Sequence, residues 1–570
     1  MSDAHLPGDT PPRASAASRI GVAALVWSAA ILLSRIIGFV RDTVLGRTLG
    51  VSAEGDVYFN AFVIPDFVNY LLAGGILSLT FIPIFSRHLH AGTEERGWDS
   101  FSDIANFLLL LALPLTALVA FATPWFVPFV AGGFDPEQQA LLVRLTRILL
   151  PGQVFLMLGA MLSGTLQARH RHAVAAFAPC AYTVGIIVVG LALYPRLGAE
   201  AFAWGVLGGA ALGAFAIPFV ACLRAGMRWR LRLDLRNPDF RTYLALALPV
   251  MLGQSIVALD SWLWKWQGTY LESGAVSTLQ YAKTLLNVPA GVFGMAAGAA
   301  AYPTLVRLHH ERRPAEAYAL LTRAAKTTLL LAFLSQAVLS VAGEDAARLV
   351  WGFSNRRFTE SDVAAIAECL TFFALSLGAW SLHPLLARAF YARGNTWLPT
   401  VLGTVVTVLV VPLYVALRHV AGARGLAIAS SLALVAYVVP LHVALRRVVT
   451  KEIAAGGTAD DADAAADLPR WRVFIVRSVA ALAVTVGLLV AVRWGLEAAI
   501  PGTGITATIV RLIAVAVAAL PAFLATARIL GIDEARSVAQ RVAGAVSRGA
   551  ALLSRLRRRG DSAAAPPGAD

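Results

Sequence analysis

Arg35, Arg41 and Asp42 lie in the second half of the first long apolar stretch of this sequence, in the run SRIIGFVRDTVLGRTLG (34–50). In a helix, Arg35 and Asp42 fall near one face and Arg41 lies at its flank. A charge within a membrane-spanning helix costs about 3 kcal/mol by insertion scales, so it normally faces a cavity or a partner. Guanidinium groups bind phosphate in bidentate fashion, which predicts an anion site here. Alternatively, Arg41 and Asp42 extend to the membrane interface.

Four further charged residues interrupt apolar runs and are candidate functional residues. Asp56 lies in GDVYFNAF, where a role in substrate binding and a position at the interface are both possible. Asp260 and Lys265, in VALDSWLWKW, are candidates for ion binding or gating; they could pair with each other, or Lys265 could reach the periplasmic interface. Lys283, in LQYAKTLLNVPAGVFG, is predicted to face a cavity and to bind substrate.

Signatures of enzymes and metal sites are missing from the sequence. It contains no Gly-rich phosphate loop, no HExxH and no paired carboxylates in a polar domain. Cys180, Cys222 and Cys369 fall in apolar runs without metal-ligand spacing, as buried structural cysteines do. We therefore expect a transporter rather than an enzyme, with no cofactor and no metal.

The composition predicts an all-α polytopic membrane protein. Of the 570 residues, 58% are hydrophobic and 14% are charged, whereas soluble proteins have about 25% charged residues. The net charge of +14 comes from arginines in short loops between apolar runs. This is the pattern of the positive-inside rule, not of a nucleic-acid-binding face.

Apolar windows long enough to cross a bilayer recur about fourteen times. They lie near 21–47, 53–86, 99–130, 138–168, 173–194, 200–223, 239–267, 274–306, 316–343, 361–391, 397–417, 425–445, 472–497 and 504–527. The basic loops after the even-numbered spans are predicted to be cytoplasmic, and so are both termini. The protein is therefore expected in the cytoplasmic (inner) membrane.

An internal repeat indicates two six-helix halves. Span two ends in FIPIFSRHLH and span eight in AYPTLVRLHH, while spans four and ten end in QAR and YAR, an offset of six spans in both cases. Transporters built from such repeats bind substrate between the halves. The predicted divisions are a disordered N-terminus (1–18), an N-lobe (19–223), a basic linker (224–241), a C-lobe (242–448), a second linker (449–471), two final spans (472–527) and a basic amphipathic tail (528–570).

Several of these stretches resemble the MurJ (MviN) family of lipid II flippases, within the multidrug/oligosaccharidyl-lipid/polysaccharide exporter superfamily. The matching runs are SRIIGFVRD (34–42), GDVYFNAFVIP (55–65), GGILSLTFIPIFS (74–86), YAKTLLNVPAGVFGMAAGAAAYPTL (281–305) and FYARGNTWLP (390–399). The resemblance implies two six-helix lobes around a central cavity, with spans thirteen and fourteen forming a groove for a polyprenyl tail. It also implies substrate-binding roles for Arg35, Arg41 and Asp56.

The sequence departs from the family pattern at other positions. The family's arginine pair and glutamate in span two are replaced by Asn69, Tyr70 and Gly74, and its arginine in span eight by Thr284, one residue after Lys283. The sodium sites described for the family use acidic and Asn residues of spans seven and eleven. Asp260 could match the first, but span eleven has neither Asn nor Asp, so coupling to sodium is not expected, whereas another ion or the membrane potential could drive transport.

The function implied by the resemblance is translocation of lipid-linked peptidoglycan precursor (lipid II) from the cytoplasmic to the periplasmic leaflet by alternating access. The expected partners are an undecaprenyl-pyrophosphate-linked glycan and the lipid bilayer; no nucleic acid is expected, and the protein is expected to be a monomer. Three alternatives remain. They are export of another undecaprenyl-linked glycan (exopolysaccharide or O-antigen), cation-coupled export of a small molecule, and a membrane scaffold that does not transport.

Overall fold

The computed structural model describes residues 33–72, 76–169, 171–291, 296–353, 357–456, 470–536 and 540. Within these ranges the regular structure is entirely helical, which confirms the predicted all-α class. The expected disordered N-terminus (1–18), the acidic stretch 458–467 and the tail beyond residue 540 lie outside the described residues.

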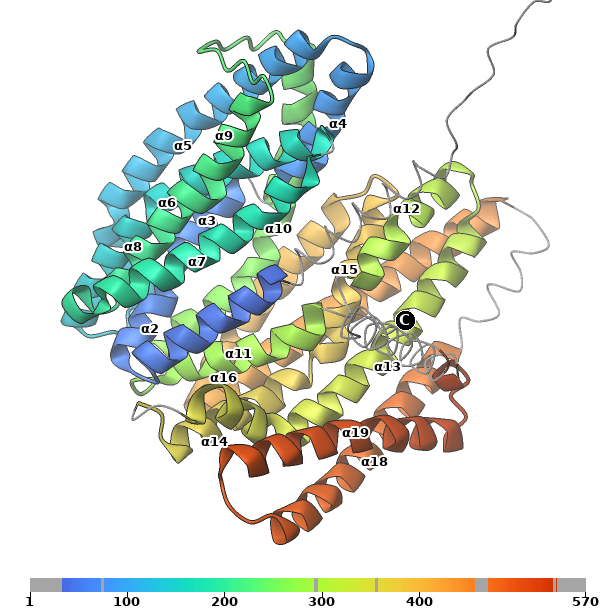
Figure 1. Cartoon of the computed structure of the whole chain (residues 1–570). Coiled ribbons are helices and arrows are strands. Elements are labelled where there is room, and N and C mark those ends of the chain that lie inside the picture. Colours follow the sequence, from blue (N-terminus) through green and yellow to red (C-terminus); the bar gives the residue numbers. More distant parts are fainter. Residues whose placement is uncertain are drawn as a thin grey trace, which may run out of the picture. The chain divides into compact units, whose positions relative to one another are not determined.

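The chain divides into two compact units, coloured along the sequence in Figure 1. The first comprises Met1–Tyr281, Ser354–Phe358 and Gly403–Leu426. Its helices are residues 33–49, α2 (Ala53–Asn60), α3 (Val63–Leu72), α4 (Ile76–His90), α5 (Glu94–Val130), α6 (Pro136–Ala168), α7 (His172–Leu197), α8 (Glu200–Gly209), the π-helix η1 (Ala210–Ala216), α9 (Ile217–Arg224), α10 (Pro238–Gly268) and the start of α11 (Ala275–Ala290).

The second unit comprises Ala282–Phe353, Thr359–Leu402 and Ala427–Asp570. Its helices are the rest of α11, α12 (Ala296–His310), α13 (Pro314–Ala347), the π-helix η3 (Arg348–Gly352), α14 (Glu360–Ala374), α15 (Leu377–Tyr391), most of α16 (Trp397–Gly456), α18 (Arg470–Ala499) and α19 (Ile505–Ile529). Helix α16 is interrupted at Gly422, whose φ of 57° ends one helix and begins the next. Its two parts correspond to the predicted spans eleven and twelve. The predicted lobe boundaries and central cavity stay predictions.

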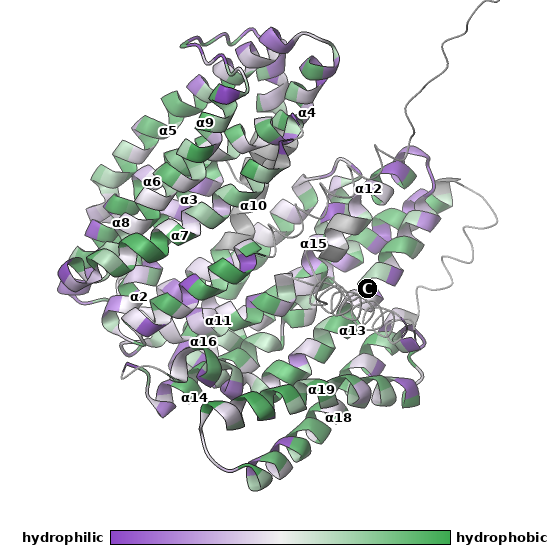
Figure 2. Ribbon diagram, viewed as in Figure 1, coloured by the Kyte–Doolittle hydropathy of each residue, from purple (hydrophilic) through white to green (hydrophobic). Residues whose placement is uncertain are grey.

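Hydrophobic residues make up most of the length of many of these helices, as the hydropathy colours of the ribbon in Figure 2 show. Among the described residues, eight helices are long and apolar enough to cross a membrane, or nine if the bent pair α14 and α15 counts as one span. Within the described residues, each of the fourteen predicted spans coincides with a helix or with a series of shorter helices, and span one is described only from residue 33. The protein is a multi-pass membrane protein.

Two predicted spans are broken within the described residues. In span two, residues 61–62 interrupt the helix between α2 and α3, and Pro65 lies in the first turn of α3, where a missing N–H costs no helical hydrogen bond. Span ten bends by 46° between α14 and α15. At this last break, Ser431 donates a 2.7 Å hydrogen bond to the carbonyl of Phe372 and Ser376 donates one of 2.7 Å to Phe373, so the freed carbonyls are satisfied inside the protein.

The basic linker after α9 is held against the first unit by polar and aromatic contacts. Trp229 packs edge-on against Phe101 of α5, with ring centroids 5.7 Å apart. Arg232 donates a 3.0 Å hydrogen bond to Asp103, a fully buried carboxylate of α5. This stretch therefore forms part of the folded unit.

Candidate functional site

Arg35, Arg41 and Asp42 lie on one helix, residues 33–49. Arg35 is exposed. Arg41 forms an ion pair with its neighbour Asp42, with 2.7 Å between Nη2 and Oδ1, and the two side chains remain 31% and 23% exposed. The pair thus carries a guanidinium whose charge is balanced by a carboxylate that an anionic ligand could displace. Their role in substrate binding stays a prediction.

Asp56 joins two helices of the first unit. Its side chain is 2% exposed and accepts three hydrogen bonds of 2.7 Å, from the backbone N–H of Gly274 to Oδ2 and from the backbone N–H and hydroxyl of Ser277 to Oδ1. These donors belong to the N-terminal end of α11, where a carboxylate balances the helix dipole. Next to it, a Cβ on Gly55 would come within 2.7 Å of the Ser277 hydroxyl, so glycine is required for this approach. In the structure Asp56 holds the start of α11 against α2.

Lys265 contacts the other end of α2. Its ammonium, 8% exposed, donates a 2.9 Å hydrogen bond to the carbonyl of Phe59, and Asn60 donates one of 3.4 Å back to the Lys265 carbonyl. On the same helix α10, Asp260 accepts a 2.5 Å hydrogen bond from the hydroxyl of Tyr414. Asp56 therefore joins α2 to the start of α11, and Lys265 joins α10 to the other end of α2. The predicted ion-binding or gating role of Asp260 and Lys265 stays a prediction.

Lys283 lies in the second unit, beside the break between α14 and α15. The ammonium is 4.5 Å from the ring centre of Phe373 and 5.0 Å from that of Trp380, and 3.4 Å from the hydroxyl of Ser430. The side chain is 6% exposed. Two aromatic faces stabilise the buried cation by cation–π attraction. A charge kept at this depth in an apolar bundle is a candidate functional group, and its contact with substrate stays a prediction.

A network of charges on α13, α18 and α19 is a feature that the sequence analysis missed. Asp345 is fully buried and forms a 3.1 Å ion pair with Arg511 of α19. Nearby, Glu344 pairs with Arg493 of α18 at 2.8 Å and with Arg348 at 2.8 Å. The signal was present as acidic residues directly after span nine and as arginines inside spans thirteen and fourteen, but these partners lie about 150 residues apart in the chain. The network holds the C-terminal helix pair on α13.

Metal ligation is not supported by the described side chains. Within the described ranges, no group of three or more His, Cys, Asp or Glu residues is placed to hold a metal ion. Cys180, Cys222 and Cys369 are buried and are not joined in disulfides.

Comparisons with known proteins agree with this architecture. The family model "Lipid II flippase MurJ" matches residues 45–514. The probable lipid II flippase MurJ of Rhizobium meliloti is 30% identical over 412 residues, covering 71% of this chain and 76% of the relative. The lipid II flippase MurJ of Burkholderia cenocepacia is 29% identical over 389 residues, covering 66% and 74%.

Solved structures show the same fold. A lipid II flippase MurJ in an inward closed conformation aligns with a TM-score of 0.68 at 21% identity, covering 89% of this chain and 98% of that one. An inward-facing MATE family multidrug resistance transporter aligns with a TM-score of 0.60 at 16% identity, covering 75% and 98%. The resemblance inferred from the sequence is confirmed, and the protein belongs to the family of the lipid II flippase MurJ, multi-pass transporters of the inner membrane.

Proposed function

We propose that this protein translocates lipid II, the lipid-linked peptidoglycan precursor, from the cytoplasmic to the periplasmic leaflet. The observation that carries the proposal is the family match over residues 45–514, together with relatives named lipid II flippase that share up to 30% identity with the chain. The all-helical architecture of the described residues, with its long apolar helices, fits a transporter. A pyrophosphate and a polar sugar head cannot cross hydrocarbon unaided, and moving them requires no covalent chemistry.

Arg41 and Asp42 are the proposed switch for the anionic head group. In the structure, Asp42 is the ion-pair partner of Arg41, with 2.7 Å between Asp42 Oδ1 and Arg41 Nη2. A pyrophosphate offers several oxygens to one guanidinium and forms stronger bidentate contacts than one shared carboxylate oxygen. We infer that the pyrophosphate replaces Asp42 as the partner of Arg41, and that Arg35, exposed on the same helix, adds a second cation.

We propose that helix α2 couples movements of the first helix, which carries Arg41 and Asp42, to movements of the neighbouring helices of the first unit. Asp56 fixes it to α11 and Lys265 fixes it to α10 through contacts at its two ends. Because α2 is only eight residues long and is followed by a break, it can reorient as a unit. We propose that these contacts position the substrate-binding helix during alternating access.

The C-terminal pair α18 and α19 is the proposed site for the polyprenyl tail. Arg493 and Arg511 hold the pair on α13. Its outer surface is apolar, with Trp494 71% exposed and Val517 67% exposed. An apolar surface on anchored helices suits a long hydrocarbon chain.

The driving force is proposed to be an ion gradient other than sodium, or the membrane potential acting on intramembrane cations such as Lys265 and Lys283. Moving one elementary charge across the membrane changes its free energy by about 2.3 kcal/mol per 100 mV of membrane potential. We further propose that both termini are cytoplasmic and that the protein works as a monomer without a bound cofactor.

Depletion of the protein from its host cell tests the proposed substrate. Loss of a lipid II flippase should cause lysis, with precursor accumulating on the cytoplasmic side of the membrane. Viable cells that lack a surface polysaccharide would instead identify an exporter of another undecaprenyl-linked glycan. Altered sensitivity to drugs with an intact wall would identify a small-molecule exporter.

A further inference from the structure

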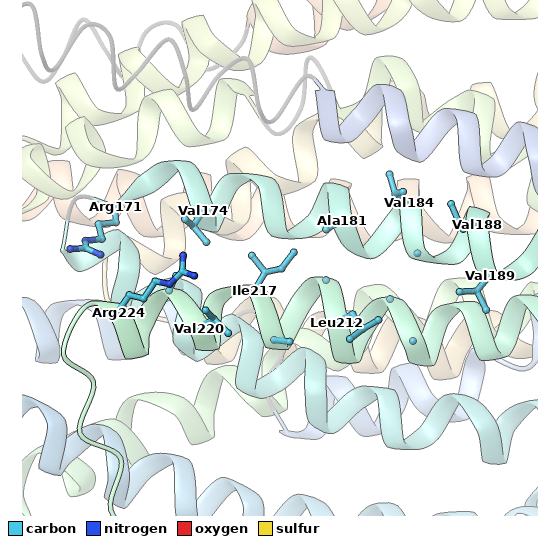
Figure 3. A pocket seen from close by; sticks show the side chains of 16 residues that line it. Arg171, Val174, Ala181, Val184, Val188, Val189, Leu212, Ile217, Val220 and Arg224 are labelled. Carbon is cyan, nitrogen blue, oxygen red and sulfur yellow. The ribbon is translucent and has the colours of Figure 1, made fainter.

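A trough in the first unit runs between α7 and the series α8, η1 and α9. Its volume is about 930 Å³, at the upper end of the range for small-ligand sites. Sixteen residues line it (Figure 3). All of them are glycine or aliphatic except Arg171 and Arg224.

The trough exists because glycines let the two helical series approach closely. A Cβ on Gly185 would lie 2.8 Å from the Cα of Gly209, and one on Gly213 would lie 2.3 Å from the backbone nitrogen of Tyr182. These positions form the line of contact between α7 and the series α8 and η1. Gly208, in contrast, faces open space, with nothing within 4 Å of an added Cβ. A larger side chain at Gly208 would therefore fill the trough without displacing its walls.

Acyl chains are the natural neighbours of this surface. Residues Ala173–Leu197 and Glu200–Arg224 are both candidate membrane spans with a mean hydropathy of 2.1. Val188 is 59% exposed and Leu212 is 70% exposed along the trough. An apolar hollow that follows two membrane spans fits a hydrocarbon chain better than a polar solute.

Two exposed arginines close one end of the trough, as Figure 3 shows for Arg171 and Arg224. Among the described residues, neither forms an ion pair with a carboxylate. Their neighbour Arg169 differs: it pairs with Glu94 and donates a hydrogen bond to the carbonyl of Ala225. Burial and, to a smaller extent, the nearby Arg171 cation lower the pKa of Arg169. The two exposed cations Arg171 and Arg224 at this end of the trough favour an anion. By the positive-inside rule it lies on the cytoplasmic side.

We propose that this trough binds an acidic phospholipid, with an acyl chain along α7 and α9 and its phosphate between Arg171 and Arg224. Basic pockets between membrane helices on the cytoplasmic side bind anionic head groups in this way. A zwitterionic lipid would bring its own cation beside the two guanidinium groups and is disfavoured. The site is separate from the proposed substrate site and does not depend on the flippase function.

Native mass spectrometry of the full-length protein in detergent, with an equimolar mixture of phosphatidylglycerol and phosphatidylcholine, tests the proposal. The wild type should retain phosphatidylglycerol preferentially. Arg171→Gln with Arg224→Gln should weaken this binding about tenfold, because two charge-assisted contacts are lost. Gly208→Leu should reduce the retention of phosphatidylglycerol by filling the trough. The matched control, Arg236→Gln with Arg241→Gln, removes two exposed arginines from the same side and should bind like the wild type.

Thermal unfolding of each variant serves as the control for folding. We expect the fold to be retained, because none of the substituted side chains is buried. Equal retention of phosphatidylcholine, or unchanged binding of phosphatidylglycerol by the double variant at Arg171 and Arg224, would overturn the proposal. Displacement of phosphatidylglycerol by a smaller amount of undecaprenyl phosphate would assign the trough to the carrier lipid and would also overturn it.

Discussion

Replacing Asp56 by asparagine separates a structural role from a role in substrate binding. Asp56 accepts two hydrogen bonds at Oδ1 and one at Oδ2, all of 2.7 Å and all from the start of α11. Asparagine can keep its carbonyl oxygen toward Ser277, but its amide nitrogen then faces the backbone N–H of Gly274. One charge-assisted hydrogen bond is lost, and two donors oppose each other in a buried place.

The expected cost is about 2–3 kcal/mol of folding free energy, the usual range for a lost hydrogen bond to a charged group. The assay is thermal unfolding of the purified protein, in which Asp56→Asn should lower Tm by a few degrees. Asp135→Asn is the matched control, because Asp135 is an exposed N-cap of α6 and asparagine caps helices about as well as aspartate. It should leave Tm unchanged.

The result that would refute this reasoning is an unchanged Tm for Asp56→Asn with a large loss of lipid II translocation. Asp56 would then act on the substrate, as the sequence analysis predicted, and not as the anchor of α11. A lower Tm with translocation that recovers at reduced temperature would support the anchoring role.

Three further substitutions test other parts of the structure. Arg511→Met should lower the free energy of unfolding by about 2–3 kcal/mol, because the buried Asp345 loses its hydrogen bonds from Arg511 and keeps only a 3.7 Å contact with Arg348. Adding Asp345→Leu should restore much of the loss; an Arg511→Met variant as stable as the wild type would contradict the pairing. Lys283→Met should keep Tm near that of the wild type, since methionine packs well against aromatic rings, but should reduce translocation in proteoliposomes; full translocation would show that the charge is dispensable. Gly213→Leu should lower the free energy of unfolding by about 3 kcal/mol or more, because the new side chain overlaps the backbone at Tyr182. Gly208→Leu should change it by about 1 kcal/mol or less. Equal Tm values for the two variants would contradict the close contact of the helices.

Long apolar runs made the helices predictable, because each run must satisfy its backbone within one segment in the bilayer. The same apolar runs gave no indication of where the helices of spans two and ten are broken. Hydropathy measures how apolar a stretch is, but the bend between α14 and α15 depends on Ser431, which supplies a hydroxyl from a different helix. Breaks that other segments stabilise cannot be read from the broken segment alone.

The candidate residues were found as charges in apolar sequence, but their partners were not. Asp56 meets Ser277 across 221 positions of the chain, and Asp345 meets Arg511 across 166. Such pairs depend on which helices pack together, and a single sequence leaves this open. Arg171 and Arg224 looked like ordinary loop charges because the trough that they close is formed by glycine contacts between α7 and η1.

The most direct test of the central claim is lipid II translocation in proteoliposomes that contain the purified full-length protein. The variant carries Arg35→Gln with Arg41→Gln, and the control carries Arg236→Gln with Arg241→Gln. If the first-helix guanidinium groups bind the pyrophosphate, the first variant should translocate at least about tenfold more slowly, and the control should keep the wild-type rate. Wild-type translocation by the Arg35 and Arg41 variant would contradict the account.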